Sequence, residues 1–114
     1  MTGYEKGDVV LVPFPFSDQS AVKKRPAVVI SSTDYNHISQ DIVIMAITSQ
    51  TAKTFGTGEC LLEDWRLAGL LKPSAIKAAI STVEQSLVLR KLGKLSPKDL
   101  VSLEDTLKDF LDIK

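Results

Sequence analysis

The stretch KKRPAVVIS, residues 23–31, decides the organisation of this chain. Three cations lead into Pro26, and the residues that follow the proline are consecutively apolar. Such a run predicts a strand over residues 26–30 that is buried on both faces. A residue that precedes proline is restricted to extended backbone. We therefore expect Arg25 to have extended backbone geometry and to project its side chain from the start of a rigid strand.

Further strands are predicted on both sides of this one. The apolar and β-branched runs that indicate them lie at residues 9–12, 42–47, 60–62 and 74–83. Pro13 and Pro15 follow the first run, and proline cannot donate to a ladder, so this strand is expected to become an edge or to leave the sheet. Polar loops are expected over residues 17–24 and 52–58.

The last element is predicted to be a helix from residue 97 to about residue 112. Ser96 is the N-cap candidate, Pro97 lies at the first helical position and Asp99 at the third, which is close to a capping box. Leucines then recur at spacings of three and four and make one apolar stripe for packing on the sheet: Leu100, Leu103, Leu107 and Leu111. Short helical turns are expected at 32–36 and at 64–69, the second ended by Gly69.

These elements indicate a mainly β fold with one terminal helix. We expect a small barrel of about five to seven short strands, closed by the C-terminal helix. The 114 residues suit one domain over residues 1–114. Hydrophobic residues make up 44% and charged residues 25% of the chain, which is typical of a globular protein rather than a disordered one.

Charge and cysteine content narrow the functional classes. The chain has 14 basic and 14 acidic side chains, so only a local patch could serve nucleic acid. The single cysteine, Cys60, excludes an intramolecular disulfide and a cysteine-ligated zinc cage, and it fits a reducing cytoplasm. Glu5, Lys6 and Asp8 precede the first apolar run, unlike a signal peptide, and no run approaches the roughly 20 residues of a membrane helix. We expect a cytoplasmic protein without a membrane span.

The sequence lacks the residue combinations of the common catalytic sites. The one histidine, His37, lies in a turn region and is expected to face solvent. Cys60 lies in a predicted strand, where a core thiol is expected rather than a nucleophile. Glu63 and Asp64 are adjacent, so their carboxylates point apart in a strand. No spacing of these residue types predicts a metal site, and we expect no cofactor.

Arg25 and two strand-end hydroxyls remain as the candidate site. If the strands at 26–30 and 42–47 pair antiparallel, Arg25 begins one strand where Thr48 and Ser49 end the other. A guanidinium fork beside a hydroxyl is a good binder of a phosphate group. The alternative is a surface arginine beside strand-end polar residues, and the residues alone leave both open.

Five segments in order carry a family resemblance: GDVVLVPFPF at 7–16, KKRPAVVIS at 23–31, IVIMAITSQ at 42–50, AGLLKPS at 68–74 and LGKLSPKDL at 92–100. Together they resemble the MazF/PemK group of bacterial toxins over nearly the whole chain. The resemblance implies an SH3-like barrel with a C-terminal helix, usually a homodimer. It also implies metal-independent, sequence-specific cleavage of single-stranded RNA such as mRNA, and a cognate antitoxin whose disordered segment folds over the active groove.

The resemblance also assigns roles to residues of this sequence. The catalytic arginine of the family corresponds to Arg25 and its threonine to Thr48. The remaining polar residues near these two positions are interpreted as RNA contacts: Lys23, Lys24, Ser49, Gln50 and Lys53. RNA supplies its own nucleophile, the 2′-hydroxyl, so products with a 2′,3′-cyclic phosphate are expected. The first loop, SDQSAVKK at 17–24, departs from the glycine-rich loop of many members.

Two alternative functions, from other classes of protein, stay open. One is a topoisomerase poison like the CcdB group, which shares the fold but depends on a tryptophan near the end of the chain, whereas the only tryptophan here is Trp65. The other is a non-catalytic binding barrel in which Arg25 grips nucleic acid or a protein tail. Intact RNA after long incubation with stoichiometric protein would favour the second.

Overall fold

The computed structural model describes residues 3–15, 22–51 and 56–113. Its strands are β1 Asp8–Pro15, β2 Val22–Val29, β3 Asp41–Thr48, β4 Cys60–Leu61, β5 Ala75–Glu84 and β6 Arg90–Lys94. Its helices are α1 Thr33–Ile38 and α2 Pro97–Leu111, with a short 3-10 turn η1 at Gln85–Leu87. The predicted strands are present, as are the C-terminal helix and the helical turns predicted near residues 32–36 and 64–69, and β6 is an element that the sequence did not indicate.

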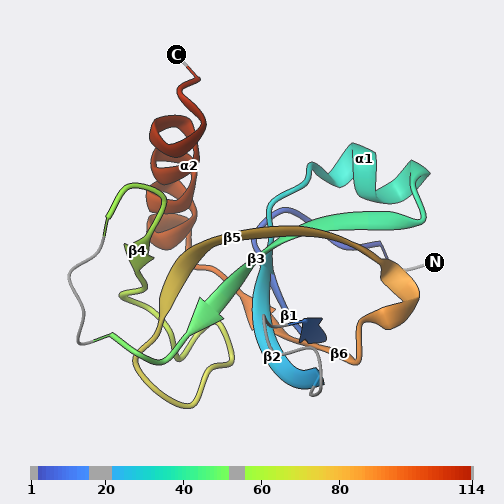
Figure 1. Ribbon diagram of the computed structural model, residues 1–114, viewed down its shortest axis with the longest axis horizontal. Helices are drawn as coiled ribbons and strands as arrows, with labels where there is room; N and C mark the ends of the chain where they lie inside the picture. Colours follow the sequence, from blue (N-terminus) through green and yellow to red (C-terminus); the bar gives the residue numbers. More distant parts are fainter. Residues whose placement is uncertain (1–2, 16–21, 52–55, 114) are drawn as a thin grey trace.

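The strands form one antiparallel sheet of six, in the order β4-β5-β3-β2-β1-β6. The sheet curls strongly into a half-barrel, and α2 stands beside its β4 end (Figure 1). The prediction of a mainly β fold with five to seven strands and a C-terminal helix is confirmed. β4 and β6 remain as the two edges of the curled sheet.

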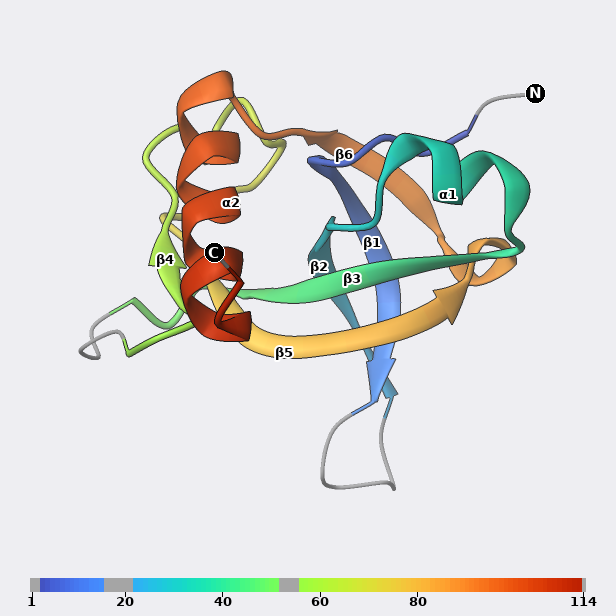
Figure 2. The ribbon, with the colours of Figure 1, turned by 90° about the horizontal axis from the view of Figure 1, so that it is seen from above.

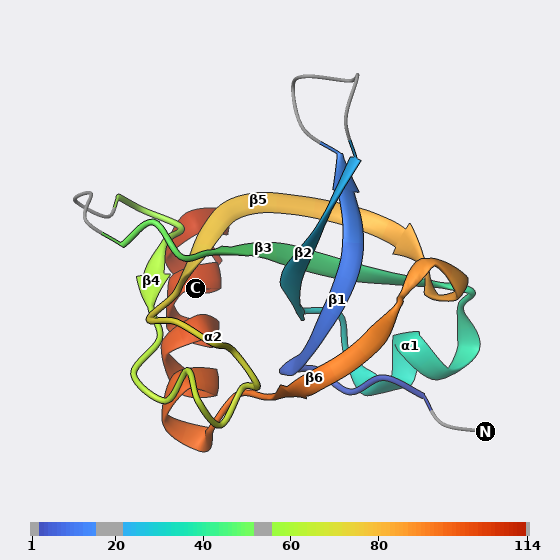
Figure 3. The ribbon, with the colours of Figure 1, turned by 90° about the horizontal axis from the view of Figure 1, so that it is seen from below.

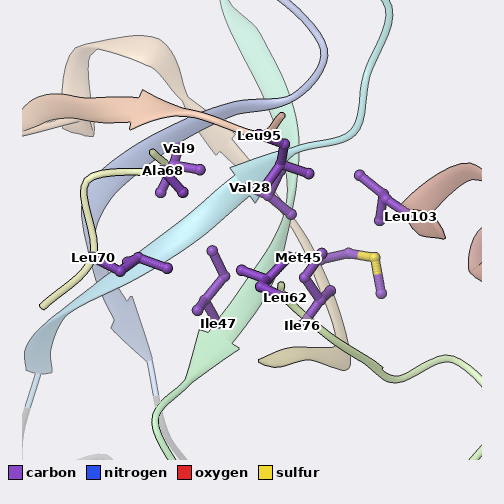
Figure 4. Packing of buried hydrophobic residues seen from close by; sticks show 10 residues of the cluster. All are labelled: Val9, Val28, Met45, Ile47, Leu62, Ala68, Leu70, Ile76, Leu95 and Leu103. Atoms are coloured by element: carbon purple, nitrogen blue, oxygen red, sulfur yellow. The ribbon is translucent and has the colours of Figure 1, made fainter. Parts of the chain in front are cut away.

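Two apolar clusters lie on the two faces of this sheet. The first joins the sheet to α2 and to the segment between β4 and β5 (Figure 4). Val28, Met45, Ile76 and Leu103 are fully buried in it. The second cluster contains Val12, Ala27, Val29 and Ala46 among other strand residues. Because β2 and β3 supply alternate residues to both clusters, their sequences read as continuous apolar runs.

The β1–β2 pair extends further than the sequence predicted. β6 pairs with β1 only as far as Leu11, whereas β2 pairs with β1 through Pro15. The proline-containing end of β1 is therefore an edge, as expected. The boundary of the following loop was wrong, because β2 begins at Val22 and includes Lys23 and Lys24. The hairpin continues past the rest of the sheet, and Figures 2 and 3 show it crossing β3 and β5 and projecting beyond them.

Helix α2 begins as predicted. Ser96 is the N-cap, and its side chain accepts a hydrogen bond from the backbone N–H of Asp99. The second half of a capping box is absent, because the Asp99 carboxylate instead accepts bonds from the backbone N–H groups of Glu63 and Asp64 at 3.0 and 2.9 Å. Asp99 is buried, and these two hydrogen bonds connect α2 to the segment that follows β4.

The apolar stripe of α2 is less uniform than its spacing suggested. Leu103 is fully buried, and Leu100 and Leu107 are partly buried against the same cluster. Leu111 is 50% exposed, so its predicted packing on the sheet was wrong. The last turn of α2 extends past the core, and the helix ends at Leu111, followed by the C-cap Asp112 with left-handed backbone geometry.

The start of β1 is fixed by a buried carboxylate. Asp8 is 1% exposed, its Oδ2 accepts a hydrogen bond from Glu5 N, and its Oδ1 lies 3.2 Å from Lys91 Nζ on β6. The pair joins β1 to its neighbour β6, which are the first and last strands in the sequence. In the described part of the chain, no helix has the length and apolar character needed to cross a membrane.

Candidate phosphate-binding site

Strand register places Arg25 opposite Thr48. β2 and β3 are antiparallel, with Ala27 paired to Ala46 and Val28 to Met45. Continuing that register by two residues aligns Arg25 with Thr48, the last residue of β3. The expected antiparallel pairing of these strands is confirmed. Arg25 lies inside β2 and not at its start, where it was expected. It lies just past the end of the β2–β3 ladder, where β2 is no longer paired with β3.

Both residues also lie on one face of the sheet. Side chains alternate along a strand, so Arg25 shares the face of Ala27, and Thr48 shares the face of Ala46. Ala27 and Ala46 belong to the same apolar cluster. Arg25 and Thr48 are both half-buried. The Thr48 Oγ1 accepts a hydrogen bond from Gln50 N at 3.1 Å, so the hydroxyl hydrogen is left to donate elsewhere.

A cleft of about 390 Å³ opens at this end of β2. Its polar lining includes four cations, Lys24, Arg25, Lys72 and Arg90, together with the hydroxyl residues Ser49 and Ser74. Its apolar lining comes from Leu11, Pro26, Ile47, Leu70, Leu71 and Leu92. No carboxylate is among the described residues that line it. Lys24, Lys72 and Arg90 are exposed and form no ion pair with any described residue. The cleft is therefore suited to an anion.

One wall of the cleft depends on two glycines that pack closely. Residues 65–69 form helical turns that end at Gly69, whose φ of +81° is left-handed, and Leu70 N donates to Trp65 O across that end. This is the predicted stop at Gly69. A Cβ built on Gly69 would meet the Leu92 carbonyl oxygen at 2.1 Å, and one on Gly93 would meet the Ala68 backbone at 2.7 Å. Only glycines let this turn sit directly on β6.

The remaining predicted contacts are distributed unevenly. Lys24 and Ser49 line the cleft with Arg25, whereas Thr48 does not. Lys23 is exposed on β2 beside them but is not part of the cleft lining, and Gln50 is exposed just past β3. Lys53 lies outside the described residues. Lys72 and Arg90 were missed, because nothing in their local sequence marks them and only the curl of the sheet brings β6 and the 69–74 segment beside Arg25.

A second hollow has the opposite charge. It measures about 560 Å³ and lies between residues 56–59 and the C-terminal half of α2. Glu59, Asp105, Asp109 and Asp112 line it beside Lys108. Although it is larger, its carboxylates would repel a phosphate, so the cleft at Arg25 is the better candidate for an anionic ligand.

The other reactive side chains have structural surroundings. His37 is exposed on α1, as expected. Cys60 is partly buried against the core, and burial raises the pKa of its thiol, with a smaller opposing effect from a hydrogen bond with Thr106. A raised pKa lowers the thiolate fraction and makes Cys60 a poor nucleophile. Among the described residues, no group of three or more His, Cys, Asp or Glu side chains is placed to hold a metal ion.

The fold and this site define a small curled β-sheet domain that aligns a strand-held arginine with a threonine and has a cationic cleft that Arg25 also lines. The family model described as PemK-like, MazF-like toxin of type II toxin-antitoxin system matches residues 5–111. The chain therefore belongs to this toxin family, and the resemblance inferred from the sequence is confirmed.

Solved structures support the fold over almost the full length. An endoribonuclease in complex with its cognate antitoxin from Mycobacterial species aligns with a TM-score of 0.78 at 15% identity, covering 97% of each chain. A MazE-MazF structure from Deinococcus radiodurans aligns at 0.74 and 19% identity over 100% of both chains. Mycobacterium tuberculosis toxin MazF-mt6 aligns at 0.71 and 15% identity, covering 92% of this chain and 98% of that one. At these identities the likeness shows the fold. No curated protein matches the sequence.

Proposed function

We propose that this protein is the endoribonuclease toxin of a type II toxin-antitoxin system and that it cleaves single-stranded RNA at Arg25 and Thr48. One observation carries the proposal: in a member of the toxin family, the β2–β3 register aligns Arg25 with Thr48 on one face of the sheet, just past the end of the β2–β3 ladder. Structural neighbours named as endoribonucleases have the same fold.

In the proposed mechanism Arg25 and Thr48 hold the scissile phosphate. The guanidinium fork of Arg25 takes two non-bridging oxygens and offsets the extra negative charge of the transition state. Thr48 donates its hydroxyl hydrogen to the same phosphate, since its oxygen already accepts from Gln50 N. The 2′-hydroxyl of RNA attacks the adjacent phosphorus and the 5′-oxygen leaves, so one product ends in a 2′,3′-cyclic phosphate. DNA, which lacks that hydroxyl, is not cut.

The remaining contacts follow the exposed cations. Lys23 and Lys24 neutralise backbone phosphates along the β2 edge, and Ser49 and Gln50 extend the RNA-binding surface beyond β3. Lys53 is proposed as a further RNA contact. A cognate antitoxin with an acidic segment neutralises the toxin by covering the same cations. The neighbour that carries its cognate antitoxin, and the MazE-MazF neighbour, support this partner. A homodimer acting on mRNA in the cytoplasm completes the proposal.

The test is to incubate purified protein with a long unstructured transcript and to sequence the RNA ends. Wild type should cut at a defined motif without added metal and leave cyclic phosphate ends. Arg25→Ala should lower the single-turnover rate by about 10²–10³ or more, the usual effect of removing one charge-stabilising donor. Arg25→Lys should also be severely impaired, because lysine keeps the charge but loses the planar fork. Thr48→Ala should lose less.

Lys108→Ala is the matched control, since Lys108 is an exposed cation on α2, which packs on the other face of the sheet. Circular dichroism should show that each variant is folded. A folded Arg25→Ala protein that cuts as fast as wild type would refute the role of Arg25. Intact RNA with stoichiometric wild-type protein would refute the nuclease and favour a non-catalytic binding domain.

A further inference from the structure

Lys77 of β5 is a cation that the mechanism above does not use. In the β3–β5 ladder Thr48 is paired with Ala75, and paired residues project from the same face of a sheet. Side chains alternate along a strand, so Lys77 projects from the face of Ala75. Lys77 therefore lies on the sheet face that carries Arg25 and Thr48, on the opposite side of β3 from Arg25.

The packing of the residues that follow the lysine gives the same orientation. Ala79 packs against the apolar cluster that contains Ala46. Ala78 lies instead on the face that α2 covers, because a Cβ built on Gly58 would meet both the Ala78 Cβ at 3.0 Å and the Phe110 ring at 2.6 Å. The side chains of β5 thus alternate regularly here, and the lysine projects on the side of Ala79.

A bulge in β5 lies directly beside Thr48. The β3–β5 ladder has a register shift between Met45 and Ile47, across which residues 77–79 of β5 lie opposite a single residue of β3. Bulges of this kind redirect a side chain, and they are common next to active sites. Lys77 is diagonal to Thr48 across the ladder, a relation that separates two residues by about 7–8 Å in a regular sheet and is within reach of a lysine side chain.

Small residues form the surface between these polar groups. Ala27 and Ala46 are buried in the shared cluster, and Ala79 packs against it. Alanine has no side-chain atom beyond Cβ, so these positions form a low floor beneath the longer side chains. Lys77 is exposed and forms no ion pair with any described residue. Its ammonium is therefore available to an anion that lies over this floor.

We propose that Lys77 is a third phosphate-contacting residue of this site and that its charge stabilises the scissile phosphate in the transition state. The proposal rests on the proposed RNA cleavage at Arg25 and Thr48 and adds one group to it. A phosphate at the Thr48 hydroxyl meets the guanidinium from β2 on one side and the ammonium from β5 on the other. Negative charge grows on the phosphate as the 2′-hydroxyl attacks, and a preorganised cation then binds it more strongly than in the ground state.

The covalent step needs no proton from this lysine. The bond between the 2′-oxygen and phosphorus forms as the bond from phosphorus to the 5′-oxygen breaks. The proton of the 2′-hydroxyl is transferred, in the net reaction, to the 5′-oxygen that leaves. Lys77 keeps its own proton and acts through its charge.

The experiment measures single-turnover cleavage of one transcript by Lys77→Gln, Lys77→Arg and the control Lys108→Gln at saturating protein. Lys77→Gln should lower the rate by about 10²-fold, the usual effect of removing one charge-stabilising donor. Lys77→Arg should recover most of that loss, because it keeps the charge. Lys108 is exposed on α2, on the other face of the sheet, and its variant should match wild type.

Saturation distinguishes this role from that of a lysine that only attracts RNA. A folded Lys77→Gln protein with the wild-type rate at saturation would overturn the proposal, even if its affinity for RNA fell. A Lys77→Arg protein as slow as Lys77→Gln would also overturn it, because charge is the property that the proposal assigns to this residue.

Binding separates failure of this proposal from failure of the nuclease. The probe is a labelled RNA 8-mer with 2′-O-methyl groups, which cannot be cut by this route, and its affinity is measured for Arg25→Gln, Lys77→Gln and the double variant. Two residues that hold one phosphate should have effects that differ from additivity by more than about twofold, whereas Lys108→Gln should combine additively with Arg25→Gln. If wild type cuts no RNA but Arg25 and Lys77 are coupled, the shared phosphate site is supported and the nuclease is refuted. Additive effects of Arg25 and Lys77 would refute the shared site.

Discussion

Removing the Asp99 carboxylate should destabilise the protein more than any other change to a charged group on α2. Asp99 is 1% exposed and accepts two backbone hydrogen bonds, at 3.0 Å from Glu63 N and 2.9 Å from Asp64 N. It also lies in the first turn of α2, where a negative charge is favourable. The carboxylate therefore joins the helix to the segment that leads into the Gly69 turn and the cleft.

The magnitude follows from the exposure of each donor. Asp99→Ala leaves the half-buried Asp64 N–H without its partner, at a cost of about 1–3 kcal/mol, whereas water can replace the bond to the exposed Glu63. Loss of charge at the helix N-terminus adds about 0.3–1 kcal/mol. We expect a decrease of about 3 kcal/mol in the free energy of unfolding. Asp99→Asn keeps one acceptor oxygen and should lose about half as much.

Urea denaturation should be followed by far-ultraviolet circular dichroism and by the fluorescence of Trp65, which lies in the adjoining turn. Coincident transitions would support a two-state analysis. Asp105→Ala is the matched control, because Asp105 is exposed on the same helix and should change stability by less than about 0.5 kcal/mol. An Asp99→Ala protein within 0.5 kcal/mol of wild type would show that the two bonds do not stabilise the fold.

Three further predictions concern the core, the cleft wall and pH. Leu103→Ala should lower the free energy of unfolding by about 2–5 kcal/mol in urea denaturation, because Leu103 is fully buried, and an unchanged midpoint would contradict this. Gly69→Ala should lower the melting temperature and weaken RNA binding, because its φ is +81° and its Cβ would meet the Leu92 carbonyl at 2.1 Å; an unaltered thermal scan would argue against that packing. The hydrogen bond and charge of Lys6 lower the pKa of Glu104 from 4.5, so this pair stabilises the fold above that pH and the benefit is lost as pH falls. Glu104→Gln should therefore cost about 0.5 kcal/mol at neutral pH, progressively less as pH falls below 4.5, and nothing in about 1 M salt, and a cost that stays the same as pH falls would refute the assignment.

Local patterns in the sequence were enough for most of the elements. The leucine spacing and the Ser96-Pro97 start predicted α2, because helix period and capping depend on neighbours in the chain. The apolar run before Thr48 and the Arg25-Pro26 junction predicted β2 and β3. Their antiparallel pairing was then sufficient to place Arg25 with Thr48, and the structure has that pairing.

Features that depend on distant partners could not be predicted in this way. β6 reads RKLGK, which has only one apolar residue and no strand pattern, and it is a strand because β1 offers it a free edge. The charge of Asp99 suggested a capping box, but two backbone N–H groups from another segment bind its carboxylate instead. Leu111 fitted the helical stripe, yet no part of the core reaches it.

By itself, then, the sequence determined the strand and helix order, the alignment of Arg25 with Thr48 and the family. Only the tertiary structure decided that Lys72 and Arg90 share a cleft with Arg25. The reason is that a neutral chain with evenly mixed charges carries no local signal for a cationic patch. The curl of the sheet, and the close packing of Gly69 on β6, gather cations from three separate segments into one surface.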